Sequence, residues 1–115
     1  MWGVIILDEN LPSQFLKELT PLLYLHSLEW INDPHNRLGL YPGMEDDKII
    51  STAWEYDAYI VTYNGRHFKN YPKAIPIPYG WKVTSEKGLR KGLNAILIFL
   101  INEGYADYAD EISLH

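Results

Sequence analysis

Val4-Ile-Ile-Leu-Asp-Glu-Asn-Leu-Pro12 runs from an apolar segment into two carboxylates, an amide and a proline. The segment from Gly3 to Leu7 is short, branched and apolar at both alternating positions, which is typical of a strand buried on both faces of a parallel sheet. Asp8 and Glu9 therefore stand at the C-terminal end of a predicted strand. In open α/β sheets this is the end at which ligands bind.

A helix is predicted directly after this strand, because Asn10 is a preferred N-cap residue and Pro12 is tolerated in a first helical turn. Its apolar residues recur at helical spacing: Leu11, Phe15, Leu16, Leu19, Leu22 and Leu23. The remaining elements are expected as a strand at 23–31, a loop at 32–43, a helix at 45–56, a strand at 58–62, a short helix or turn at 66–71, one or two edge strands within 75–84, and a helix capped by Thr84 or Ser85. This order predicts an α/β fold, with a small, mostly parallel, doubly wound sheet covered by helices on both faces.

The last helix is apolar nearly all round in its second half, where Ile98 and Phe99 depart from the main apolar stripe. A helix of a small domain cannot easily bury both sides alone. We therefore expect either a homodimer contact or cover from the tail, Tyr105 to Leu114.

Length and composition bound the class of protein. A chain of 115 residues with 47% hydrophobic and 22% charged residues is typical of one globular domain, residues 1–115. The absence of cysteine excludes disulfides, thiolate zinc sites and cysteine nucleophiles. The N-terminus does not resemble a signal peptide, and the longest apolar run, 95–101, is too short to span a membrane, so we expect a cytoplasmic protein without a membrane partner.

Charge is distributed unevenly although the net charge is -5. Seven of the ten basic residues, but only one acid, Glu86, lie between Arg66 and Lys91. Such a segment is either a solvated basic face or a local contact for a polyanion.

Polar side chains gather where three of the predicted elements meet one edge of the sheet. Asp8, Glu9 and Asn10 follow the first strand, Glu45, Asp46 and Asp47 open the second helix, and the end of the third strand provides Thr62 and Asn64. Because adjacent parallel strands end about 5 Å apart, these groups can share one cavity. Oxygen ligands without cysteine suit Mg²⁺ or Mn²⁺. The alternatives are structural: Asp8 as a helix cap, Asp46 and Asp47 as first-turn acids, and Asn64-Gly65 as a turn pair.

Three blocks of the sequence, Leu7-Asp-Glu-Asn-Leu-Pro12, Gly43-Met-Glu-Asp-Asp-Lys-Ile49 and Tyr59-Ile-Val-Thr-Tyr-Asn64 with His67-Phe68, resemble the short PIN-like domains. These are relatives of PIN-domain ribonucleases, which include toxins of bacterial toxin-antitoxin pairs. The resemblance covers roughly residues 3–70. It implies a three-layer α/β/α fold whose acids hold one or two Mg²⁺ or Mn²⁺ ions for hydrolysis of RNA phosphodiesters.

Carried over by position, the resemblance assigns catalytic roles to four residues: Asp8, Asp46, Thr62 and Asn64. Asp8 and Asp46 match metal-binding acids, and Thr62 matches a hydroxyl residue. Asn64 falls where the family usually has a third acid, which should lower the affinity for a metal. Glu9 or Asp47 would orient water or support the metal ligands.

Residues after the third strand are expected to bind the substrate. Arg66, His67 and Lys69 would meet phosphates of single-stranded or structured RNA, and His67 is open to a role as ligand or base. Unpaired bases would stack on Phe68, Tyr71, Tyr79 or Trp81. The other aromatic residues, Tyr41, Trp54, Tyr56 and Tyr59, are interpreted as packing in the core and at its rim.

Two other functions compete with a metal-dependent ribonuclease. The first is a PIN-like module that has lost its third acid and binds RNA or a protein partner such as an antitoxin, without cleavage. The second is a flavodoxin-like or receiver-like signalling domain, which would use strand-end aspartates for phosphorylation. The sequence has no evident lysine at the end of the last strand, which such a signalling domain would need.

Overall fold

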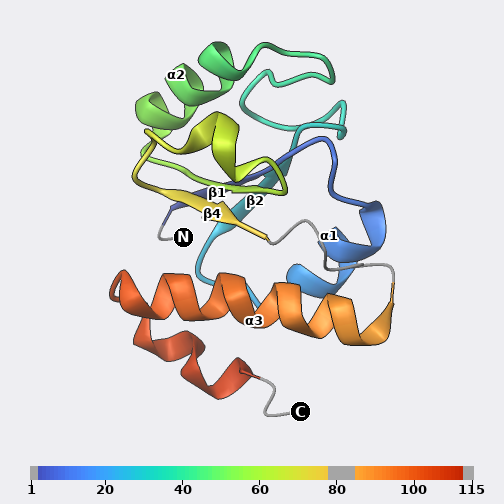
Figure 1. Cartoon of the computed structure of the whole chain (residues 1–115), viewed down its shortest axis with the longest axis vertical. Helices are drawn as coiled ribbons and strands as arrows, with labels where there is room; N and C mark the ends of the chain where they lie inside the picture. The colour runs from blue at the N-terminus through green and yellow to red at the C-terminus, as the bar shows by residue number, and fades with distance from the viewer. Residues whose placement is uncertain (1–2, 78–84, 113–115) are drawn as a thin grey trace.

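The computed structural model describes residues 3–77 and 85–112 as a mixed α/β domain in three layers (Figure 1). Four strands form its sheet: β1 (Val4–Leu7), β2 (Ser27–Trp30), β3 (Tyr59–Thr62) and β4 (Ala74–Pro76). All neighbouring pairs are parallel, in the order β2-β1-β3-β4. This confirms the predicted fold class.

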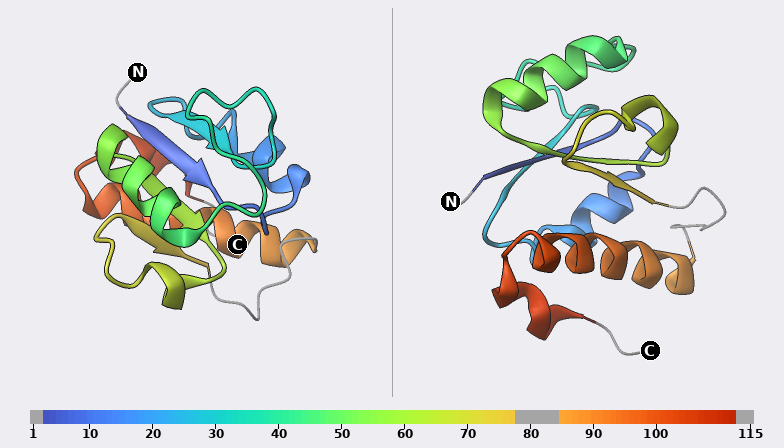
Figure 2. Two further views of the ribbon diagram at one scale, coloured as in Figure 1. Left: turned by 90° about the horizontal axis from the view of Figure 1, so that it is seen from above. Right: turned by 60° about the vertical axis from the view of Figure 1, so that its left-hand side comes forward.

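Helices cover both faces of the sheet, as Figure 2 shows from two directions. Helix α2 (Asp46–Tyr56) lies on one face, and α1 (Ser13–Leu19) and α3 (Glu86–Asn102) lie on the other (Figure 1). Two short 3-10 helices, η1 (Gly65–Phe68) and η2 (Ala106–Glu111), complete the order of elements. None of the helices in the described ranges is long and apolar enough to cross a membrane.

The alternation of side chains along each strand separates two cores. Ile5 and Leu7 of β1 pack with α1, α3 and η2, whereas Ile6 between them packs with α2 and η1. Strand β3 divides in the same way, because Val61 faces the first core and Ile60 the second. Both faces of the central strands are therefore dry, as the unbroken apolar run of β1 predicts.

The tail covers the second half of α3, as one of the two sequence-based alternatives proposed. Tyr108 of η2 is fully buried in the same core as Leu97 and Leu100 of α3. Ile98 remains half exposed on the outer side of the helix. The homodimer stays a prediction.

Local details correct some of the expected boundaries. Asn10 does not cap α1: its neighbour Leu11 closes a turn onto the Asp8 carbonyl, and α1 begins only after Pro12, which is extended. Ser85 does cap α3, by accepting a hydrogen bond from the Gly88 N–H at 3.1 Å. The expected strand at 81–84 and the stacking residues Tyr79 and Trp81 lie outside the described residues.

Candidate functional site

Asp8 is buried at the point where β1 ends. Its backbone N–H donates to the Val61 carbonyl at 3.0 Å and so extends the pairing of β1 with β3 by one residue. Its side chain is only 4% exposed. The hydrogen bond from Asp8 to Val61 therefore holds the Asp8 carboxylate in the dry interior. A buried charge is stable there only if hydrogen-bond donors or opposite charges contact it.

Thr62 supplies one of those partners from the end of β3. Its hydroxyl donates to Asp8 Oδ2 at 2.6 Å and accepts from the Asn64 N–H at 2.9 Å. The other oxygen, Asp8 Oδ1, accepts from the Glu9 N–H at 2.8 Å. Asp8, Thr62 and Asn64 are thus joined in one chain of hydrogen bonds, although Asp8 lies more than fifty residues before the other two in sequence.

The electrostatic environment of Asp8 is unfavourable to its charge. Burial raises the pKa of Asp8 above its usual 3.8, and the nearby carboxylates of Glu9 and Asp46 raise it further. The hydrogen bonds from Thr62 and the Glu9 N–H act in the opposite direction. A cation between the carboxylates would relieve both the burial cost and the repulsion.

Asp46 reaches this region from the first turn of α2. Its Oδ2 lies 3.0 Å from Nδ1 of His67, which is on η1. Both side chains are substantially exposed. The structure therefore brings His67 to Asp46, where sequence reasoning placed it among phosphate contacts, candidate ligands and bases.

Glu9 ties the loop 32–43 to the end of β1. Its Oε2 accepts from the Gly43 N–H at 3.0 Å, and its carbonyl accepts from Asn32 Nδ2 at 2.9 Å. This contact holds Gly43, three residues before the start of α2 at Asp46, against the residue that follows Asp8. Asp47 is exposed in the same first turn.

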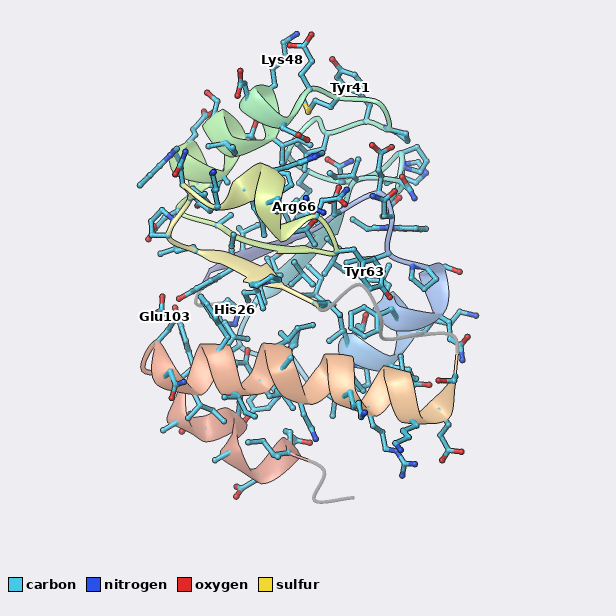
Figure 3. The ribbon with its side chains drawn as sticks, viewed as in Figure 1. His26, Tyr41, Lys48, Tyr63, Arg66 and Glu103 are labelled. Carbon is cyan, nitrogen blue, oxygen red and sulfur yellow. The ribbon has the colours of Figure 1, made fainter. Side chains whose placement is uncertain are left out.

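A cleft of about 770 Å³ lies at the ends of β3 and β4, and one of its lining residues, His67, contacts Asp46. It is lined by Tyr63, Asn64, Gly65, Arg66, His67, Pro76 and Ile77. In Figure 3, Tyr63 lies toward the end of the sheet at which the strands terminate, Arg66 lies on η1, and His26 is at the opposite end. Arg66, His67 and Lys69 are all exposed.

The chemistry of the donors fits a hard divalent cation in part. The carboxylates of Asp8 and Asp46 and the side-chain oxygens of Thr62 and Asn64 are the oxygen ligands that Mg²⁺ and Mn²⁺ prefer. Across residues 3–77 and 85–112, no three or more histidine, cysteine or acidic side chains gather into a group that could hold a metal ion. An ion would thus rest on two carboxylates, supplemented by neutral oxygens and the substrate.

Three residues of the site escaped sequence reasoning. Tyr63, Pro76 and Ile77 line the cleft because β4 runs parallel to β3 and the Ile77 N–H donates to the Thr62 carbonyl at 2.8 Å. The sequence signal was the apolar, proline-spaced run 75–78 after a strand, which predicts an edge strand but not its neighbour.

Comparison of the chain with protein-family models, with curated proteins and with solved structures gave no match.

Proposed function

We propose that the protein is a metal-dependent endoribonuclease of PIN-like type, which hydrolyses RNA phosphodiesters with Mg²⁺ or Mn²⁺. One observation carries this proposal: the charge of Asp46 raises the pKa of a buried, hydrogen-bonded carboxylate, Asp8, and Asp46 contacts His67, which lines a cleft together with Arg66. Partners that stabilise the charge of a structural aspartate lower its pKa. The surroundings of Asp8 instead raise its pKa, and perturbed pKa values of this kind cluster at functional sites.

In this proposal, some residues of the site hold a cation and others bind the substrate. Asp8 and Asp46 would be the ligands, and Thr62 would fix the orientation of Asp8 through its short hydrogen bond. A bound divalent cation supplies Lewis-acid activation of water and neutralises charge that develops on the phosphate. Arg66 would bind a phosphate oxygen in the adjoining cleft.

A cleavage assay tests the proposal. Purified protein is incubated with a mixed RNA pool and Mn²⁺ or Mg²⁺, beside Asp8→Asn, Asp46→Asn and the matched surface variant Asp110→Asn. We expect cleavage by the parent protein and by Asp110→Asn, which alters an exposed acid on η2. Absence of cleavage, or equal cleavage by all four proteins, would refute the nuclease.

The contact between His67 and Asp46 favours a second candidate. A PIN-like module with weakened catalysis would bind RNA or a protein partner, such as the antitoxin of a toxin-antitoxin pair, without cutting RNA. In support of it, His67 occupies one ligand oxygen of Asp46, and Asn64 brings no charge where an acid is expected. Calorimetric titration with Mn²⁺ separates the two candidates, because the module requires no ion and the nuclease does.

A further inference from the structure

The hollowed surface beside the carboxylates continues over η1. A second hollow, of about 360 Å³, is lined by Gly65, Arg66, Phe68, Lys69, Tyr71, Ala74 and Pro76. Gly65, Arg66 and Pro76 line both this hollow and the cleft. Arg66 therefore stands between two adjoining depressions, and Lys69 stands at the far one.

An exposed tryptophan lies next to the second hollow. Trp54 of α2 is 59% exposed, although aromatic residues in this helix were expected to pack in the core or at its rim. Its ring meets Tyr71 edge to face, with the ring centroids 5.1 Å apart. Tyr71 is itself buried, and its hydroxyl donates to the Ala58 carbonyl. Trp54 is thus held on one side by a fixed ring while most of its surface faces solvent.

The charges along this surface suit an anionic chain. From Ala58 to Ser85 the sequence holds no acid, whereas Arg66, Lys69 and Lys73 fall within it. Of the two acids at the end of α2, Asp57 is bound by Lys73 at 2.6 Å and Glu55 is exposed. Cations close to an accessible aromatic ring are the features that bind single-stranded nucleic acids, because phosphates meet the cations and bases stack on the ring.

We propose that this surface carries single-stranded RNA out of the cleft, with phosphates at Arg66 and Lys69 and an unpaired base stacked on Trp54. This inference deepens the proposed nuclease function, on which it rests, by defining the substrate as an unpaired strand. Trp54 lies eight residues after Asp46 in the same helix, which is about 12 Å along its axis. A short oligonucleotide bound at the carboxylates does not reach it, but a longer one does.

Binding of RNAs of two lengths tests the inference. Fluorescence anisotropy is measured with a labelled uridine dinucleotide and a labelled uridine decanucleotide, in Asp8→Asn protein so that the RNA stays intact. Trp54→Ala should weaken binding of the decanucleotide at least about fivefold, since stacking on one aromatic ring is worth at least about 1 kcal/mol. Binding of the dinucleotide should not change, and Trp54→Phe should retain most of the affinity.

Tyr24→Ala is the matched control, because Tyr24 is also an exposed aromatic residue, at 53%, but it contacts η2 and not Tyr71 beside the second hollow. We expect it to leave both affinities unchanged. Arg66→Ala and Lys69→Ala should each flatten the salt dependence of decanucleotide binding, since each removes one phosphate contact. Equal decanucleotide affinity of Trp54→Ala and its parent would overturn the proposal, as would tighter binding of the matching deoxyribose decanucleotide.

The two proposals fail separately. RNA cleavage that depends on Asp8 and Asp46, with no effect of Trp54→Ala on binding, would leave the nuclease and remove the stacking surface. Binding that depends on Trp54, without cleavage in Mn²⁺ or Mg²⁺, would leave the surface and refute the nuclease.

Discussion

Thr62→Val removes the hydroxyl that holds Asp8 while it preserves the shape of the side chain. Thr62 is fully buried, and its hydroxyl donates to Asp8 Oδ2 and accepts from the Asn64 N–H. A hydrogen bond to a charged group contributes about 1.5–3 kcal/mol. Asn64 is partly exposed, so its freed N–H can turn to water at little cost. We therefore expect a loss of about 2–3 kcal/mol in the free energy of unfolding.

Urea denaturation at neutral pH measures this loss. With a slope of about 2 kcal/mol per molar urea, the midpoint should fall by about 1–1.5 M while the slope stays unchanged. The control is Thr52→Val, because the Thr52 hydroxyl donates only to the Lys48 carbonyl on the exposed side of α2. Its effect should stay within about 0.5 kcal/mol.

The pH dependence of the stability loss caused by Thr62→Val also tests the role of Asp8. The Thr62 hydrogen bond lowers the pKa of Asp8, so it favours the charged carboxylate over the neutral acid. The penalty of Thr62→Val should therefore shrink as the pH falls through the pKa of Asp8 in the folded protein. Equal midpoint shifts for Thr62→Val and Thr52→Val, or a penalty that does not change with pH, would show that the Thr62 hydroxyl does not stabilise a charged Asp8.

Three further predictions concern other parts of the fold. Burial lowers the pKa of His26 from 6.5 to about 4. The contribution of His26 to stability should therefore be constant above pH 6.5 and fall by at most about 3 kcal/mol between pH 6.5 and 4 in acid titrations, and His26→Gln should remove this contribution. Gly65→Ala would place a Cβ 2.9 Å from the Cβ of Pro76, so thermal unfolding should show a loss of about 1–3 kcal/mol. His67→Ala frees Asp46 from its 3.0 Å contact and should tighten Mn²⁺ binding measured by calorimetry.

Each of these predictions has its own control. His35→Gln, at an exposed histidine, should leave the acid titration unchanged. Gly39→Ala meets no atoms within 4 Å, but its positive φ of 72° makes it a test of backbone strain without crowding. Weaker Mn²⁺ binding by His67→Ala would show that His67 helps to hold the ion instead of competing for Asp46.

The strand ends were the predictable part of the site. Asp8 and Thr62 could be placed together from the sequence, because adjacent parallel strands end at one edge and both residues directly follow apolar runs. The buried hydrogen bond between them follows from the pairing of β1 with β3.

Contacts between elements could not be predicted in the same way. The approach of His67 to Asp46 requires η1 to dock against the start of α2, and neither element's own sequence encodes that arrangement. Likewise, the sequence predicts Asn10 as the N-cap of a helix. In the structure, however, the Leu11 N–H donates to the Asp8 carbonyl in a turn, and α1 begins only after Pro12. A local propensity was overridden there by the geometry of the strand end.

The exposure of the aromatic residues also depends on how the elements pack, so it could not be predicted from the sequence. Tyr59 is buried as expected, but Tyr41, Trp54 and Tyr56 are exposed. In α2 the buried positions are Ile49 and Ala53, so the larger ring of Trp54 is left outside. The sequence shows the aromatic residues but not which of them face solvent.

A crystal structure of the protein soaked with Mn²⁺ would show whether Asp8 and Asp46 share an ion. We expect one ion bound by carboxylate oxygens of both residues, at about 2.1 Å, with Asp46 withdrawn from Nδ1 of His67. A structure in which no ion lies between the two carboxylates, and in which Asp46 keeps its contact with His67 in the presence of Mn²⁺, would contradict the proposed metal site.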